Sequence, residues 1–308
     1  MTRGRRALVS WIATAAGVAL FAASLARVDL HALTKNPSRI ALALLLSLAA
    51  SGMWHAVRTL AWRTCFNESE RVSFARLARV RLAAEAFSFL TWSGVTGEPL
   101  KVILLGEEVS PRSAVKAIAV DRLVFVAVTF AIVCAASAAA WTAPTLSQGR
   151  ARLFIAFAIV AGVIASGAIA GVRRFARGAL DFRRAAALTA LSIAAYTSLC
   201  AEAWMILRLA GVPISFLDAV VIETIARVAS IASSFIPANL GALEATSLAA
   251  AAAVGASGGG APLAIVRRLR GLFWAGAGLV GGARFASPAG SRRSRWFQAF
   301  QGSGSAGS

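Results

Sequence analysis

Six acidic residues of this 308-residue chain lie inside apolar segments. They are Glu85, Glu98, Asp121, Glu202, Glu223 and Glu244, and four arginines, Arg122, Arg227, Arg267 and Arg268, have similar surroundings. A charged side chain at the centre of a bilayer costs about 2.5 to 3.5 kcal/mol on insertion scales, so each of these groups needs a partner or water. They are the candidates for substrate binding, proton transfer or structural ion pairing.

Helical spacing predicts two of the ion pairs. Arg81 and Glu85 are four residues apart, and so are Glu223 and Arg227. Residues with this spacing are neighbours on one face of a helix. We therefore assign these four side chains to structure or gating rather than to direct contact with a substrate.

The sequence TWSGVTGEP at 91–99 places turn residues directly around Glu98. Pro99 suits the first turn of a helix, where its missing amide proton is not needed. Gly94 and Gly97 permit a sharp turn before it. A short helix is therefore predicted to begin near Glu98, with Lys101 one turn later.

The sequence PANLG at 237–241 has the same role before Glu244. Pro237 is expected to end one short helix, because proline disrupts a helix interior. Asn239 and Gly241 are acceptable N-cap residues for the next one. Glu244 then falls in the first turn of that second helix.

Two helix N-termini are thereby expected to approach each other inside the membrane. Such a terminus attracts anions, and nearby lysine or arginine side chains would add full positive charge. A phosphate headgroup fits this description. The candidate substrate-binding residues are Glu98, Lys101, Arg122, Asn239, Glu244 and Arg268.

Two simpler interpretations of these residues stay open. First-turn glutamates such as Glu98 and Glu244 can merely complement the helix dipole. Arg122 and Arg268 can pair with Asp121, which adjoins Arg122, or with acids on neighbouring helices. Binding a phosphate and pairing with an acid are compatible roles.

The composition indicates an integral membrane protein. Hydrophobic residues make up 58% of the chain and charged residues 15%, against about 45 to 50% and about 25% in soluble domains. The net charge of +19 would suggest nucleic acid in a soluble protein. Here the basic residues cluster between apolar spans, so they indicate membrane topology and no nucleic-acid partner is expected.

The chain is predicted to be all-α, with six crossing helices and two re-entrant helical hairpins. A crossing needs about 20 apolar residues. The predicted crossings are 7–26, 40–58, 117–141, 153–172, 185–209 and 262–283, and the hairpins are 82–105 and 213–254. Tryptophans near the span ends, such as Trp62 and Trp274, are interpreted as anchors at the membrane interface.

Arginine placement orients the chain. Dense basic clusters occur at 3–6, 58–81, 173–184 and 284–295. Cytoplasmic loops carry the Lys/Arg excess, so all four clusters are assigned to one side. Six crossings and two hairpins satisfy this rule with both termini in the cytoplasm of a bacterium, and the protein in its inner membrane.

An internal repeat is visible at an offset of 146 residues. Arg81 and Glu98 align with Arg227 and Glu244, and Arg122 aligns with Arg268. We predict inverted repeats at about 39–141 and 185–284 within one transmembrane domain, 1–285, followed by a basic and then flexible tail, 286–308. Inverted repeats are common in secondary transporters.

The sequence lacks the signatures of nucleotide hydrolysis by a P-loop and of a zinc protease. It contains no Walker A loop and no HExxH. Neither the two distant histidines, His31 and His55, nor the three isolated cysteines have metal-ligand spacing. We expect no cofactor, no metal and no enzymatic activity.

At its two hairpins the chain resembles the lysylphosphatidylglycerol synthase transmembrane-region family, also called flippase-like domain proteins. The motifs are Gly97-Glu98 with Lys101 and Asp121-Arg122, then Pro237, Leu240-Gly241 and Glu244 with Arg268. The resemblance covers about residues 8–285. No synthetase domain follows residue 285, so we do not expect this chain to make lysyl-lipid.

The resemblance implies movement of an amphipathic lipid between leaflets, such as an aminoacylated phospholipid, a polyprenyl-phosphate carrier or a hopanoid-type lipid. Its partner would be that membrane lipid, with a homo-oligomer or a lipid-biosynthesis protein as further candidates. Two alternatives remain. The chain could be a non-transporting subunit of a lipid-modifying complex, or an intramembrane enzyme with Glu98 or Glu244 as general base.

Overall fold

The computed structural model describes residues 37–67, 70, 72–90, 97–106, 108–141, 148–175, 181–233, 236 and 241–286. Every regular element in these ranges is helical. This confirms the predicted all-α class for the described part of the chain. The predicted crossing at 7–26 and the tail after Ala286 lie outside the described residues.

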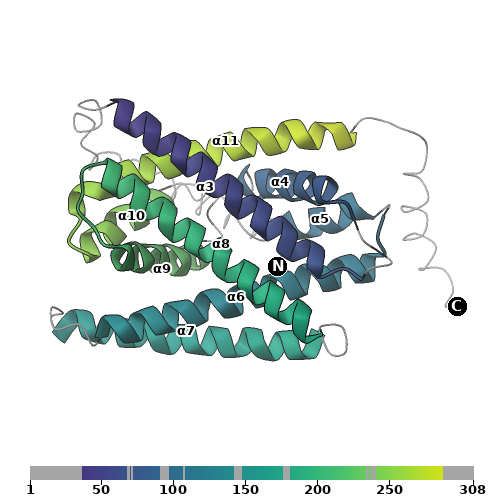
Figure 1. Ribbon diagram of the computed structural model, residues 1–308, viewed down its shortest axis with the longest axis horizontal. Helices are drawn as coiled ribbons and strands as arrows, with labels where there is room; N and C mark the ends of the chain where they lie inside the picture. The colour runs from purple at the N-terminus through teal and green to yellow at the C-terminus, as the bar shows by residue number, and fades with distance from the viewer. Residues whose placement is uncertain are drawn as a thin grey trace, which may run out of the picture.

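Five long helices form the frame of the molecule (Figure 1). They are α3 (Pro37–Thr64), α6 (Pro111–Trp141), α7 (Gln148–Phe175), α8 (Phe182–Leu209) and α11 (Gly260–Ala286). Each contains one of the predicted crossings. By length and apolar composition, α3, α8 and the stretch Pro111–Ser137 of α6 can span a membrane. The protein is thus a multi-pass membrane protein, while the number of six crossings stays a prediction.

Two pairs of short helices interrupt this frame. The first pair is α4 (Phe74–Leu90) with α5 (Gly97–Leu105), and the second is α9 (Phe216–Ala232) with α10 (Ala242–Ala253). The helices of each pair pack against each other. The 9 residues of α5, at about 1.5 Å each, are far too short to cross a hydrocarbon core of about 30 Å. Both predicted helix breaks are present.

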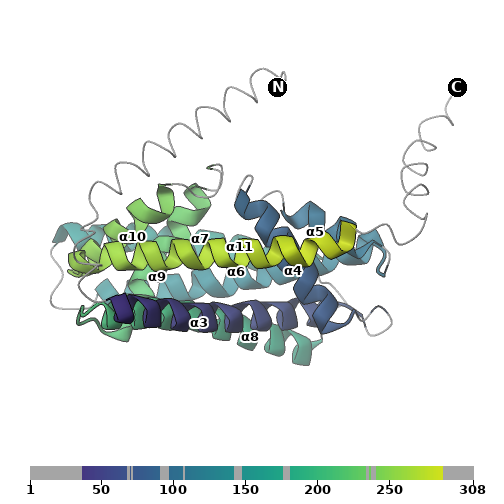
Figure 2. The same cartoon turned by 90° about the horizontal axis from the view of Figure 1, so that it is seen from above.

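The short pairs lie at opposite ends of the molecule (Figures 1 and 2). The long helices α3 and α8 pack side by side, α6 and α7 form a second packed pair, and α11 runs past both short pairs. In contacting α4 and α10, α11 joins elements from the two ends. A side chain on α11 can therefore reach residues of both.

Helix order, length and packing recur at the 146-residue offset. The offset carries 37–64 onto 183–210, one residue from α8, and 97–105 onto 243–251, inside α10. Packing partners recur as well: α5 packs on α6 as α10 packs on α11, and α4 packs on α11 as α9 packs on α6. Only α7 has no counterpart among the described helices. Inversion of one half relative to the other in the membrane stays a prediction.

Trp62 occupies the core and not the membrane interface. Its residue exposure is 1%, and it packs with Leu77, Val80 and Leu105 beneath the first short pair. The expectation of an interfacial anchor was wrong here. A tryptophan near the end of a helix can bury its apolar ring against neighbouring helices as well as place it among lipid headgroups. Trp62 does the former, because its ring faces α4 and α5.

Candidate functional site

A cavity with two adjoining lobes, both lined in part by charged side chains, lies between the short helix pairs. The first lobe, of about 210 Å³, is enclosed by α3, α4 and α11 with one residue each from α8 and α9. The second, of about 220 Å³, is enclosed mainly by α9, α10 and α11. Phe89, Leu199, Arg227, Arg270 and Gly271 line both lobes. The two lobes therefore adjoin each other at these residues.

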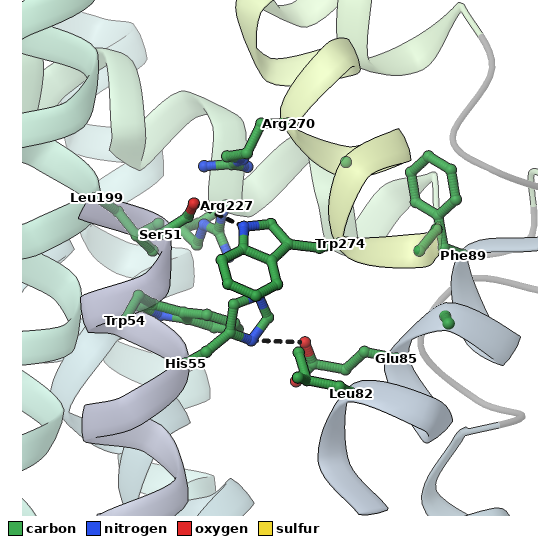
Figure 3. A pocket seen from close by; sticks show the side chains of 13 residues that line it. Ser51, Trp54, His55, Leu82, Glu85, Phe89, Leu199, Arg227, Arg270 and Trp274 are labelled. Carbon is green, nitrogen blue, oxygen red and sulfur yellow. Dashed lines mark hydrogen bonds and ion pairs between the residues drawn. The ribbon is translucent and has the colours of Figure 1, made fainter. Parts of the chain in front are cut away.

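The first lobe holds an acid, a histidine and two tryptophans (Figure 3). Nδ1 of His55 lies 3.2 Å from Oε2 of Glu85. The other carboxylate oxygen of Glu85 pairs with Nε of Arg81 at 2.8 Å. The guanidinium of Arg81 in turn lies over the ring of Trp54. The predicted Arg81–Glu85 pair is thus confirmed, with His55 added from a different helix.

Trp274 closes the first lobe from α11. Its indole Nε1 donates a hydrogen bond to Oγ of Ser51 at 2.8 Å, and its ring packs against His55 (Figure 3). A buried indole N–H normally finds such a partner. The ring is half-buried and its polar edge is satisfied inside the protein, while its role as an interfacial anchor stays a prediction.

The second lobe is rich in arginine. Arg227, Arg267, Arg268 and Arg270 line it together with one acid, Glu223. Glu223 is fully buried and pairs with Nε of Arg227 at 2.8 Å and with Nη2 of Arg267 at 2.6 Å. The predicted Glu223–Arg227 pair is confirmed, and Glu223 serves two cations at once.

Arg270, another arginine of the lobe, pairs with an acid outside it. It forms a very close ion pair with Glu202 on α8, which is fully buried and also accepts a hydrogen bond from Oγ of Ser47 on α3. This contact joins α3, α8 and α11. Because a buried charge must be paired, Glu202 fixes the position of the Arg270 guanidinium at the junction of the two lobes.

The two candidate glutamates each pair with the candidate arginine of their own half. Nε of Arg122 donates to Oε1 of Glu98 at 2.7 Å, and Nε of Arg268 donates to Oε1 of Glu244 at 2.7 Å. Both pairs join residues 24 apart in the sequence. Lys101 adds a second cation to Glu98 alone, at 3.0 Å.

The two glutamate–arginine pairs differ in exposure. The side chain of Arg122 is 47% exposed, whereas that of Arg268 is 14% exposed and lines the second lobe. Glu98, Lys101 and Arg122 line neither lobe. The candidate substrate-binding residues thus form two separate clusters, of which only the Arg268 cluster opens into the cavity.

Asp121 pairs with a residue that the sequence did not single out. Its Oδ2 accepts a hydrogen bond from Nη2 of Arg58 at 2.7 Å, and the guanidinium of Arg58 also lies over the ring of Phe125. Adjacent residues on a helix point in different directions. Asp121 therefore faces α3, while its neighbour Arg122 faces Glu98 on α5.

The helix starts agree with the predicted capping. Glu98 and Glu244 both lie in the first turns of their helices, Pro99 lies in the same turn as Glu98, and Gly241 is the N-cap of α10 with φ +74°. Such a φ favours glycine. Gly94, Pro237 and Asn239 lie outside the described residues.

Gly97 is required for a reason other than the predicted sharp turn. A Cβ at this position would lie 2.6 Å from the carbonyl oxygen of Ala84 on α4. Only hydrogen fits in that space. Gly97 therefore lets the start of α5 approach α4 closely, which places Glu98 at the end of the pair.

The family of the lysylphosphatidylglycerol synthase TM region matches residues 7–278. The chain belongs to this family. The matched range contains all the described helices up to most of α11, both lobes of the cavity and both glutamate–arginine pairs. This family is a membrane domain linked to lipid handling. A comparison with curated proteins finds no match.

Several residues of the cavity were not predicted to belong to a site, among them Arg270, His55 and Trp274. Arg270 lies in the same apolar span as Arg267 and Arg268, so the same signal was present. His55 was set aside for lack of a second histidine, yet its partner is a carboxylate. Trp274 gave no separate signal, because a tryptophan at a span end fits an interfacial anchor equally well.

Among the described residues, no group of three His, Cys, Asp or Glu side chains could hold a metal ion.

Proposed function

We propose that the protein moves an amphipathic lipid between the leaflets of a membrane, with the lipid headgroup passing through the two-lobed cavity. The observation that carries this proposal is the cavity itself. It places five charged residues and several hydroxyls in one lobe, inside a bundle in which α3, α6 and α8 are long and apolar enough to span a membrane. Charged residues at membrane depth commonly mark substrate pathways.

We further propose that the two halves are inverted repeats and that α4–α5 and α9–α10 are re-entrant hairpins entering from opposite sides. The recurrence of helix order and packing at one offset supports this arrangement. Transporters of this plan expose a central site alternately to each side. A state open on one side only would expose one of the two equivalent arginines more than the other, as is found for Arg122 and Arg268. Both termini would lie in the cytoplasm.

Reconstitution tests the transport step. Purified protein in vesicles containing fluorescent-headgroup phospholipid should make inner-leaflet lipid accessible to an added quencher. Glu98→Gln and Glu244→Gln should each lower the transfer rate by about tenfold, or ~1.4 kcal/mol in the barrier, because both weaken equivalent pairs. Glu108→Gln is the matched control, since Glu108 forms a surface pair with Arg76.

Two results would overturn the proposal. One is the absence of leaflet transfer with phospholipid, polyprenyl-phosphate and hopanoid-type probes alike. The other is unchanged transfer in both glutamine variants. Appearance of a chemically altered lipid by mass spectrometry would instead indicate an intramembrane enzyme.

A further inference from the structure

His55 is the one histidine in the described part of the chain, and it lines the first lobe. Its side chain is 13% exposed. Its Nδ1 lies 3.2 Å from Oε2 of Glu85, close enough for an ion pair, although the two do not form a hydrogen bond of standard geometry. Histidine is the side chain whose ordinary titration falls between about pH 5 and 8. The lobe therefore contains a group that can bind and release a proton near neutral pH.

Glu85 has a charge partner with or without a proton on His55. Its Oε1 pairs with Nε of Arg81 at 2.8 Å, on the same helix. When His55 is neutral, the carboxylate is balanced by Arg81 alone. When His55 is protonated, Glu85 gains a second cation, on α3. Both charge states are thus compatible with the packed helices, which reversible proton binding requires.

The imidazole of His55 joins three helices. It belongs to α3, it contacts Glu85 of α4, and its ring centroid lies 4.6 Å from that of Trp274 on α11. The indole of Trp274 is held in place by its hydrogen bond to Ser51 of α3, at 2.8 Å (Figure 3). A change of charge on His55 therefore alters the attraction between α3 and α4 at a point where α11 contacts both.

The other charged groups around this pair come from several helices. Arg227 of α9 and Arg270 of α11 line the same lobe, Arg58 follows one turn later on α3, and Lys101 of α5 acts on Glu85 through its charge. Because each of these four cations has an acid other than Glu85, it opposes a proton on His55 less than an isolated cation would. The acids are Glu223 for Arg227, Glu202 for Arg270, Asp121 for Arg58 and Glu98 for Lys101.

The histidine–glutamate pair occurs in one half of the chain only. At the offset of 146 residues, His55 corresponds to Ala201 and Glu85 to Ile231. The two glutamate–arginine pairs, by contrast, recur at that offset. A contact that the architecture of a half requires would be expected in both halves. Its presence in one half favours a function separate from the shared scaffold.

We propose that His55 and Glu85 form a proton-binding site, and that the proton bound there is the coupling ion for lipid movement. The coupling rests on the proposed function, whereas the proton site does not. The imidazole takes up one proton from one side of the membrane, becomes an imidazolium paired with Glu85, and gives the same proton up to the other side. Uptake adds attraction between α3 and α4, and release removes it. Ionisable residues at membrane depth commonly form proton relays.

Nuclear magnetic resonance of the purified full chain in detergent tests the proton site. The chain has two histidines, so in the variant His31→Gln a label of 15N on histidine reports His55 alone. Its ring-nitrogen signals should change from those of the neutral to those of the charged imidazole between about pH 5 and 8. In the neutral form Nδ1 should carry the hydrogen, because it faces the carboxylate of Glu85.

A second substitution in the same background tests the role of Glu85. Glu85→Gln removes the negative charge beside the imidazolium and should weaken proton binding by His55 about tenfold. Glu108→Gln is the matched control and should leave proton binding unchanged, since Glu108 pairs with Arg76 at the surface. Absence of titration between pH 5 and 8 in the His31→Gln protein overturns the proposal even if Glu85→Gln does not fold. Equal proton binding in the Glu85→Gln and Glu108→Gln proteins overturns it as well.

Vesicles with a pH difference across the membrane test the coupling. The probe is the fluorescent-headgroup phospholipid of the transfer assay. The pH difference should make it accumulate in one leaflet, His55→Gln should abolish that accumulation, and Glu108→Gln should retain it. A probe distribution indifferent to the pH difference, with transfer intact, overturns the coupling. Titration of His55 without leaflet transfer of any lipid overturns the transport function and leaves the proton site standing.

Discussion

Single ion pairs within this protein have very different surroundings. Arg58 and Asp121 are almost completely buried, whereas Glu108 in its pair with Arg76 is 40% exposed. Removing one partner of a buried pair leaves an unpaired charge where it cannot be solvated. Removing one partner of a surface pair leaves a charge that solvent accommodates.

Asp121→Asn should therefore lower stability strongly. We expect a loss of about 3 to 5 kcal/mol, because Arg58 keeps its charge and loses its acid. The measurement is the thermal unfolding of the purified protein in detergent. Glu108→Gln should cost no more than about 1 kcal/mol. Equal melting temperatures for the two variants would show that Asp121 is not the main partner of Arg58.

The sequence predicted pairs within one helix better than pairs between helices. Arg81–Glu85 and Glu223–Arg227 follow from a spacing of four, which fixes proximity by helix geometry alone. Asp121–Arg58 and Glu202–Arg270 join residues 63 and 68 apart. Their proximity depends on how α3 packs on α6 and how α8 packs on α11, which no local pattern encodes. The Glu98–Arg122 pair is intermediate. The sequence singled out both residues as candidates for substrate binding, but it did not predict that they pair with each other.

Close helix contacts decide where the short helices begin. At Gly97, the start of α5 rests directly on α4. The sequence predicted this break because glycine and proline mark turns. It did not predict the close contact, because the position of Ala84 opposite Gly97 is a product of the folded pair.

Gly97→Ala should destabilise the first short pair. The added methyl group meets the Ala84 carbonyl, and overpacking of this kind costs about 1 to 3 kcal/mol. Gly162→Ala in α7 is the matched control, since a Cβ there meets nothing within 4 Å. The control should be neutral or stabilising by up to about 1 kcal/mol, from higher helix propensity. Comparison of the two melting temperatures in detergent tests the contact, and a Gly97→Ala protein as stable as the control would contradict it.

The topology of the whole molecule determines what the two halves can do together. Helix α7 runs from Gln148 to Phe175 between the halves. If it crosses the membrane, its two ends must face opposite compartments. The dense basic cluster at 173–184 then lies in the cytoplasm and the segment 142–152 outside.

Single cysteines at the two ends of α7 test this topology. In a background without Cys65, Cys134 and Cys200, we expect Arg183→Cys to react with a membrane-impermeant maleimide only from the cytoplasmic side. Gln148→Cys should react only from the other side. The cysteine-free protein is the control for background labelling. Reaction of both positions from one side would refute the inversion of the halves.

Helix α7, the one long helix without a counterpart among the described helices, would orient the second proposed repeat if it crosses the membrane. Each proposed repeat contains two crossings and a hairpin that returns to its own side, so a chain leaving one repeat emerges where it entered. Two such units joined directly would face the same way. A single additional crossing between them inverts the second repeat relative to the membrane. An odd number of linking crossings is therefore sufficient to make two copies of one segment face opposite compartments. By this reasoning, excising α7 would leave both hairpins opening to one compartment, with every residue of both polar clusters still present.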